Sequence, residues 1–173
     1  MTQLLRFTFS ALLALLGSAA HGEPIKNEPH DFRGLTWAIP FDEKGAAMTL
    51  IRRDGDVAYY IRKSDTLAVG QADAIKIAYR FYKGRFSAGV VQTYGVSNKK
   101  TLIDILHDRH GESSKPHKRI EQYRWAGDEA IIELTCEATS YCVAEYVSTA
   151  VSRLEAAEGG GSPAAASAGK NDD

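Results

Sequence analysis

The sequence predicts an α+β protein, with an antiparallel β-sheet of hairpins and one main helix packed on its apolar face. Two hairpins are indicated: Asp54-Gly55 lies between two segments rich in apolar residues, and Lys83-Gly84 separates two segments in which apolar and polar residues alternate. A segment with apolar residues at steps of three and four follows and predicts the helix. Further alternating segments come after it. Strands on both sides of a single helix are typical of one antiparallel sheet with a helix on one face.

The first hairpin is expected to pair Met48–Arg52 with Val57–Ile61. Gly55 lies between them and tolerates the positive φ that a tight turn needs. The second hairpin has the clearer alternation, and its two-residue turn at Lys83-Gly84 fixes the register. Three cross-strand pairs are predicted: Tyr82 with Arg85, Phe81 with Phe86, and Tyr79 with Ala88. This register places the large apolar residues on one face, as a half-buried antiparallel pair requires.

The helix is expected to begin at Ser97 or Asn98, either of which can cap it, and to end at Gly111. Its apolar positions are Leu102, Ile103, Leu106 and His110. After a loop, a strand is predicted over 120–125 and a turn at Gly127-Asp128. Two more strands flank the cysteines, and a short helix over about 149–157 ends the fold.

Residues 1–22 are predicted to be a signal peptide. Arg6 supplies a positive charge, an apolar run extends from Phe7 to Leu16, and small residues allow cleavage after Ala20 or Gly22. A membrane anchor is the alternative, but it needs about 20 apolar residues and this run is shorter. We therefore expect a periplasmic or secreted protein with no membrane span after signal removal.

Three further segments complete the expected organisation. An N-terminal linker over 23–30 leads into a single α+β domain over 31–158. Residues 159–173 are rich in glycine, serine and alanine and contain no large apolar residue. Such a segment has nothing to bury against the entropy of ordering it, so a disordered tail is expected.

Cys136 and Cys142 are the two cysteines of the chain. In an exported protein, an even and closely spaced pair indicates a disulfide. Alternating residues on both sides place the pair across a hairpin, with a turn over 137–141 between them. A redox dithiol is the alternative, but that usually requires Cys-x-x-Cys at a helix start. We predict a structural disulfide bond.

Composition limits the classes of function. The 173 residues carry 21 Lys+Arg against 22 Asp+Glu, with a formal net charge of −1. This balance argues against a nucleic-acid partner, which usually requires a strongly basic surface. The sequence contains no Gly-x-Ser-x-Gly motif and no phosphate-binding or dinucleotide-binding glycine pattern. Whether the protein is an enzyme stays open, and nothing in the pattern favours one or calls for a cofactor.

The best metal-ligating candidates are His107, His110 and His117. Two histidines at positions i and i+3 share one side of a helix, and imidazole suits zinc or copper. The structural alternative is that His110 borders the core in line with Leu106, while His107 faces the negative end of the helix dipole. Spacing without a strict motif is weak evidence for a metal.

The outer face of the second hairpin is the predicted binding surface. Its candidate residues are Lys76, Arg80, Tyr82 and Arg85, which alternate with the apolar positions. Tyrosine and arginine are enriched in binding hot spots, so this face suits an envelope protein or a cell-wall component. The alternative is a solvated sheet face whose basic residues prevent edge aggregation.

Several short motifs resemble a group of small exported bacterial proteins of unassigned function. The resemblance extends from Phe32 to Tyr146 and depends on the opening Phe32-Arg33-Gly34-Leu35-x-Trp37 and the hairpin Phe81-Tyr82-Lys83-Gly84-Arg85-Phe86, with His110-Gly111 and Trp125 further on. Members usually have glycine where Ala38 stands here, and the cysteine pair and the tail also differ. The resemblance implies a fold and transfers no catalytic residue. From their chemistry alone, Trp37 and Phe81 are expected in the core and Gly34 and Gly84 in turns.

These observations together predict an exported, non-catalytic binding module that contacts an envelope partner as an adaptor, inhibitor or immunity-type protein. The alternative is a metal-binding protein or a metal-dependent enzyme that uses the histidine cluster. A secreted structural subunit is a third hypothesis.

Overall fold

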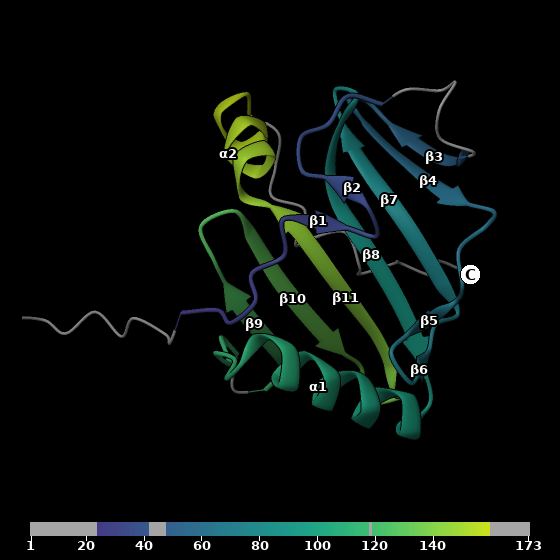
Figure 1. Ribbon diagram of the computed structural model, residues 1–173, viewed down its shortest axis with the longest axis vertical. Helices are drawn as coiled ribbons and strands as arrows, with labels where there is room; N and C mark the ends of the chain where they lie inside the picture. The colour runs from purple at the N-terminus through teal and green to yellow at the C-terminus, as the bar shows by residue number, and fades with distance from the viewer. Residues whose placement is uncertain (1–23, 42–47, 118, 160–173) are drawn as a thin grey trace, which may run out of the picture.

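The computed structural model describes residues 24–41, 48–117 and 119–159. The predicted signal peptide and nearly all of the predicted tail lie outside the described residues. The predicted α+β class is confirmed: a seven-stranded antiparallel sheet has the strand order β3-β4-β7-β8-β11-β10-β9 (Figure 1). Its strands are β3 (Met48–Asp54), β4 (Val57–Arg62), β7 (Lys76–Tyr82), β8 (Arg85–Tyr94), β9 (Glu121–Ala126), β10 (Ala130–Cys136) and β11 (Tyr141–Ser148).

The remaining elements lie around this sheet. Two small hairpins, β1 (Asp31–Phe32) with β2 (Leu35–Thr36) and β5 (Ala68–Val69) with β6 (Ala72–Asp73), form separate two-stranded sheets. The main helix α1 (Val96–His110) runs across one end of the large sheet, and α2 (Thr149–Ala157) lies toward the other end (Figure 1). Sequence alternation does not reveal the small hairpins, because strands of two residues have no period to detect.

The second predicted hairpin is correct near its turn and wrong beyond it. Tyr82 pairs with Arg85 and Phe81 with Phe86, but a β-bulge then shifts the register. Arg80, rather than Tyr79, is paired with Ala88, and Tyr79 lies opposite Gly89. Ser87 is the extra residue of the bulge: its hydroxyl donates to the Arg80 carbonyl at 3.1 Å and accepts from Arg80 Nη1 at 3.0 Å.

Helix α1 ends as predicted and begins slightly earlier than predicted. Gly111 follows its last residue with φ 82°, a left-handed conformation that favours glycine. Gly95 occupies the N-cap position, and no side chain caps the helix. Asn98 instead accepts from the Asp73 amide at 3.1 Å and donates to the Tyr94 carbonyl at 3.0 Å, which ties the helix start to β6 and β8.

The C-terminal half agrees closely with the prediction. Cys136 and Cys142 form a disulfide and lie directly opposite each other in the β10–β11 pair, with Cα atoms 4.1 Å apart. The turn between them spans 137–140. Helix α2 has the predicted bounds, and the Ser148 hydroxyl accepts from the Val151 amide at its start.

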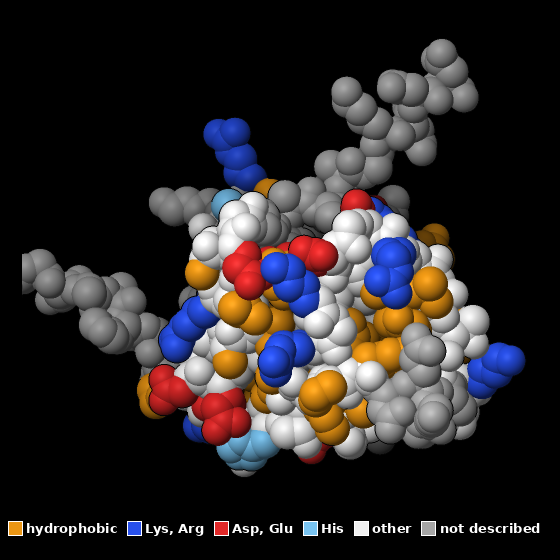
Figure 2. All heavy atoms as spheres, turned by 90° about the horizontal axis from the view of Figure 1, so that it is seen from above, with side chains coloured by type: hydrophobic (Ala, Val, Ile, Leu, Met, Phe, Trp, Pro, Cys, Tyr) orange, Lys and Arg blue, Asp and Glu red, His pale blue; other side chains and the backbone are white. Residues whose placement is uncertain are grey.

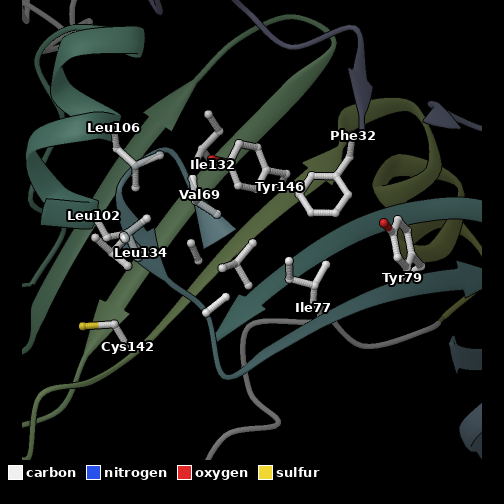
Figure 3. Packing of buried hydrophobic residues seen from close by; sticks show 14 of the residues in the cluster. Phe32, Val69, Ile77, Tyr79, Leu102, Leu106, Ile132, Leu134, Cys142 and Tyr146 are labelled. Carbon is white, nitrogen blue, oxygen red and sulfur yellow. The ribbon is translucent and has the colours of Figure 1, made fainter. Parts of the chain in front are cut away.

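The core lies between one sheet face, α1 and the small hairpins. Leu102 and Leu106 of α1 are fully buried in the same cluster as Ile132 and Leu134 of β10 (Figure 3). Aromatic residues fill the other half of the cluster, where the partly buried Trp37 stacks on Phe86 at 5.3 Å between ring centroids. Among the described residues, no helix combines the length and the apolar character needed to cross a membrane.

Candidate functional site

The predicted binding surface on the second hairpin is not the exposed face that the alternation suggested. Lys76 and Arg85 are exposed, but Arg80 and Tyr82 are each only 4% exposed. All four side chains were expected to contact solvent. The physical reason for the difference is α2, which covers this part of the sheet face and takes up the polar groups of both buried residues.

Helix α2 contacts the sheet through its acidic side chains. Glu155 Oε1 lies 2.5 Å from Arg80 Nη2, and both side chains are buried. At the end of the helix, Glu158 accepts from the Tyr82 hydroxyl at 2.6 Å and pairs with Lys83 at 2.7 Å. These two hydrogen bonds hold the pKa of the Glu158 carboxyl below its usual value. Two of the four residues predicted for binding, Arg80 and Tyr82, therefore hold α2 in place.

The three candidate metal ligands do not come together. His110 is buried, with Nδ1 3.2 Å from the Lys26 carbonyl oxygen. His107 is half-buried and contacts the Trp125 ring edge to face, whereas His117 lies exposed in the loop after α1. Within the part of the chain that the structure describes, no group of three or more His, Cys, Asp or Glu residues could hold a metal ion.

Surface charge alone does not mark a site. On the face drawn in Figure 2, basic and acidic side chains are interspersed among apolar ones. A binding site therefore has to be sought where several polar groups converge in a concave region, because such pockets are the usual ligand sites of globular proteins.

A pocket of about 610 Å³ provides such a region. It lies where the N-terminal segment, β1, the β5–β6 hairpin and the end of α1 meet over the strand β11. Its lining combines apolar and charged side chains: Asn27, Pro29, Asp31, Phe32, Arg33, Ala68, Val69, Gly70, Arg109, His110 and Tyr146. The volume is within the usual range for small-molecule pockets, roughly 300 to 1,000 Å³.

One wall of the pocket is held by Arg33, which belongs to the turn of the β1–β2 hairpin. Its guanidinium donates to the carbonyl of Thr66 at 3.1 Å and to the carbonyl of Ala68. The same group lies 3.9 Å from the carboxylate of Asp65, which is itself almost fully buried. Arg33 therefore joins the first small hairpin to the segment that leads into the second one.

Asp65 also connects this wall to the large sheet. Tyr79 of β7 donates its hydroxyl to Asp65 at 2.6 Å, and Arg62 lies 3.8 Å from the same carboxylate. Burial, followed by the bond to Asp65, raises the pKa of Tyr79, so the phenol stays protonated. The Arg62 guanidinium also lies 4.8 Å from the centre of the Tyr79 ring. The network fixes the loop after β4 on the sheet.

The floor of the pocket is aromatic. Phe32 lies between the rings of Tyr79 and Tyr146, with centroids 5.6 and 5.2 Å away (Figure 3). The Phe32 ring occupies the space where a Cβ atom on Gly89 would lie, so a glycine is needed at this position of β8. Val69 of β5 lies beside Tyr146 (Figure 3) and extends the apolar floor.

The N-terminal segment closes another side. The Lys26 amide donates to the His110 carbonyl at 3.0 Å, and Asn27 Nδ2 donates to the Arg109 carbonyl at 2.8 Å. Further along, the Glu28 carboxylate accepts from the amides of Glu129 and Ala130 at 2.7 and 2.8 Å. The segment expected to be a linker is thus hydrogen-bonded to the domain and forms part of the pocket.

The titratable groups of the pocket are mainly neutral or basic. A carbonyl oxygen can only accept, so His110 carries a proton on Nδ1 and donates it to Lys26. Burial lowers the pKa of His110, which favours the neutral ring. Burial raises the pKa of Tyr146 to about 12, although the charges of Arg109 and Arg33 oppose it. The Asp31 carboxylate accepts a hydrogen bond from the Gly34 amide at 3.0 Å.

Of the pocket residues, sequence reasoning singled out His110, for a metal site, and Phe32-Arg33, for a family resemblance. The pocket itself was missed, because its walls come from segments that are far apart in the chain and too short to show a period. The comparisons with protein families, with curated proteins and with solved structures find no match for this chain. The structure itself shows an α+β domain with a pocket lined by basic and aromatic side chains.

Proposed function

We propose that this protein is an exported, non-catalytic binding module, and that the pocket between β1, the β5–β6 hairpin and the end of α1 receives a group of its ligand or envelope partner. The observation that carries the proposal is the way in which the walls are fixed. Separate chain segments are held around one cavity by hydrogen bonds and ion pairs, of which the Arg33, Asp65 and Tyr79 contacts are central.

A fixed cavity is useful for binding because the cost of ordering its walls is met during folding. Each side chain that becomes immobile on binding costs roughly 0.5 to 1.5 kcal/mol. Arg33, Asn27 and His110 already make hydrogen bonds to the backbone of neighbouring segments. Little further ordering of these three side chains is required when a ligand enters.

Export is supported by the disulfide between Cys136 and Cys142. Disulfides form and persist mainly in oxidising compartments such as the bacterial periplasm. In that compartment no glutathione pool reduces the bond, so the covalent link between β10 and β11 persists and stabilises an adaptor, inhibitor or immunity-type protein. The proposed partner is accordingly an envelope component.

The proposal is tested by placing a photo-crosslinking amino acid with a short aliphatic diazirine side chain at Ala68 or Pro29, two positions that line the pocket. Arg153, an exposed position of α2, is the matched control. The tagged protein is irradiated in intact cells, purified and read by intact mass spectrometry, which detects adducts of small molecules and of proteins alike. We expect one discrete adduct from the pocket positions and none from Arg153.

A second variant checks that the adduct depends on the pocket. Ala68→Trp fills the cavity from a wall position, and we expect it to abolish the adduct formed from Pro29 while the protein remains folded. Equal adduct yields from the pocket positions and from Arg153, or a yield from Pro29 that Ala68→Trp leaves unchanged, would contradict the proposal.

A further inference from the structure

We infer that the pocket receives the anionic end of its ligand, a carboxylate or phosphate group on a partly apolar body, between the guanidinium of Arg109 and the hydroxyl of Tyr146. This inference rests on the proposed function, because it names the chemical class of ligand for the same pocket.

Arg109 is the basic group of the pocket that is available to a ligand. It belongs to the last turn of α1, and its side chain extends over the β5–β6 turn, with Nη2 3.9 Å from the place of a Cβ atom on Gly70. Arg33, the other arginine of the lining, already donates to two carbonyl groups and lies beside Asp65. Arg109 is exposed, and its side chain pairs with no acidic residue in the described part of the chain.

Tyr146 supplies a hydrogen-bond donor at the floor. Its phenol stays protonated at ordinary pH, because burial raises its pKa to about 12. Arg109 and Arg33 line the same pocket as Tyr146. The Tyr146 side chain makes no hydrogen bond to another described residue, which leaves its hydroxyl free to donate to a ligand.

The remaining groups of the pocket do not cancel this basic character. The lining holds two arginines against one carboxylate, that of Asp31. Asp31 accepts from the backbone of its own turn, and the neutral His110 adds no negative charge. A guanidinium with free donors in a partly enclosed site favours carboxylate and phosphate groups, to which it makes charge-assisted hydrogen bonds.

The apolar part of the lining sets the second requirement on the ligand. Phe32 and Val69 are almost fully buried, and Ala68 and Pro29 flank them at the rim. An anion without an apolar body would leave this surface in contact with water, whereas an apolar group attached to the anion covers it. We therefore expect an organic anion to bind better than inorganic phosphate.

The inference is tested by NMR titration of the isotope-labelled mature chain with three probes. N-acetylphenylalanine has a carboxylate on an aromatic body, its amide is the neutral match, and inorganic phosphate is the anion alone. We expect saturable shifts at Gly70, His110 and Tyr146 with the carboxylate, and binding at least about tenfold weaker with the amide, since a hydrogen bond to a charged group contributes about 1.5 kcal/mol or more. Inorganic phosphate that binds at this pocket more tightly than the carboxylate would overturn the requirement for an apolar body.

Variants separate a binding role from a structural one. Arg109→Gln and Tyr146→Phe should each weaken binding of the carboxylate, Arg109→Gln by about tenfold, whereas Arg109→Lys should retain most of it. Arg153→Gln, at an exposed arginine of α2, is the matched control and should bind as the unchanged protein does. The amide spectrum of each variant shows whether it is folded.

The outcomes distinguish this inference from the proposal on which it rests. Equal binding of the carboxylate and its amide, or carboxylate binding that Arg109→Gln leaves unchanged, would overturn the anionic class. A pocket-dependent adduct in the crosslinking experiment would then still support a binding module. If the crosslinker forms no pocket-dependent adduct and no probe shifts the signals of the pocket residues, both the proposed function and the ligand class are rejected.

Discussion

Arg80 on β7 and Glu155 on α2 form a buried ion pair, with 2.5 Å between Nη2 and Oε1 and with side chains that are 5% and 4% exposed. The pair lies on the sheet face opposite to the pocket, because Tyr79, the neighbour of Arg80, contacts Phe32 on the pocket side. It joins the C-terminal helix to the centre of the sheet. Arg80 Nε and Glu155 Oε2 have no hydrogen-bond partner among the described residues. Each buried charge is therefore compensated mainly by the opposite charge of its partner.

Removal of one partner of this pair should be strongly destabilising. We expect Glu155→Ala to lower the free energy of unfolding by about 3 to 5 kcal/mol, because it leaves the Arg80 guanidinium buried without a counter-ion. Urea unfolding followed by circular dichroism measures the loss. Glu158→Gln, at the exposed carboxyl that directly follows the same helix, is the control and should have a much smaller effect.

The double variant Arg80→Met with Glu155→Leu tests whether the cost comes from the unpaired charge. Replacement of both partners by apolar side chains of similar size is often close to neutral. We therefore expect the double variant to be more stable than Glu155→Ala alone. A double variant that is as unstable as the single one would show that packing, and not charge, holds α2 on the sheet.

Local patterns predicted the strands of the large sheet well, because several of them alternate in sequence and the turns of the first two hairpins contain glycine. The register of the second hairpin was wrong from the bulge at Ser87 onward, and the hydrogen bonds of Ser87 to Arg80 stabilise that bulge. The burial of Arg80 could not be predicted in the same way. Its partner Glu155 lies 75 positions away, and alternation gives the face of a side chain but not what covers that face.

The pocket was less predictable for a related reason. Phe32 and Val69 stand on strands of two residues, and their position over the sheet depends on long-range contacts of Arg33, Asp65 and Tyr79. Nothing in the spacing of these residues indicates that they meet. The candidate metal site was not predictable from spacing for the same reason. A helical i, i+3 spacing places two histidines on one side of the helix, but it does not show that His110 faces the core and that His107 contacts an aromatic ring.

Loss of the disulfide should weaken the C-terminal hairpin. Cys136→Ala with Cys142→Ala removes a link that closes a ring with a sequence separation of 6. The loop-entropy relation gives about 2 kcal/mol for a ring of this size, so we expect a decrease of that order in the free energy of unfolding. Urea unfolding of the variant, and of the unchanged protein with and without reductant, measures it. Identical midpoints with and without reductant would contradict this prediction, provided that mass spectrometry shows complete reduction.

His110 should make the protein less stable in mildly acidic solution. Burial lowers the pKa of His110 in the folded state, whereas in the unfolded chain it returns to its ordinary value of 6.5. Between these two pKa values the unfolded state binds more protons, so the free energy of unfolding decreases as the pH falls below about 6.5. The slope from this single group is at most about 1.4 kcal/mol per pH unit. Urea midpoints between about pH 8 and pH 5.5 measure it.

The matched variant for this prediction is His110→Asn, which keeps a donor near the place of Nδ1 for the Lys26 carbonyl but does not titrate. We expect its stability to depend less on pH in the same window. His30 has the opposite sign: its hydrogen bond to Glu129 raises its pKa, so its contribution is lost as the pH rises. His30→Gln is therefore a useful control. An unchanged pH profile in His110→Asn would exclude His110 as the group responsible.

Gly89→Ala should disturb the fold and the pocket together. A methyl group at this position would overlap the Phe32 ring, which is confined between Tyr79 and Tyr146 and cannot move without displacing the β1–β2 hairpin. We expect a loss of about 1 to 3 kcal/mol in the free energy of unfolding, as for other overpacked cores. A double-mutant cycle with Phe32→Leu isolates the clash, because the smaller side chain leaves room for the methyl group and the cost of Gly89→Ala should then decrease. Equal costs in both backgrounds would place the effect of Gly89 in the backbone of β8 and remove Phe32 as its cause.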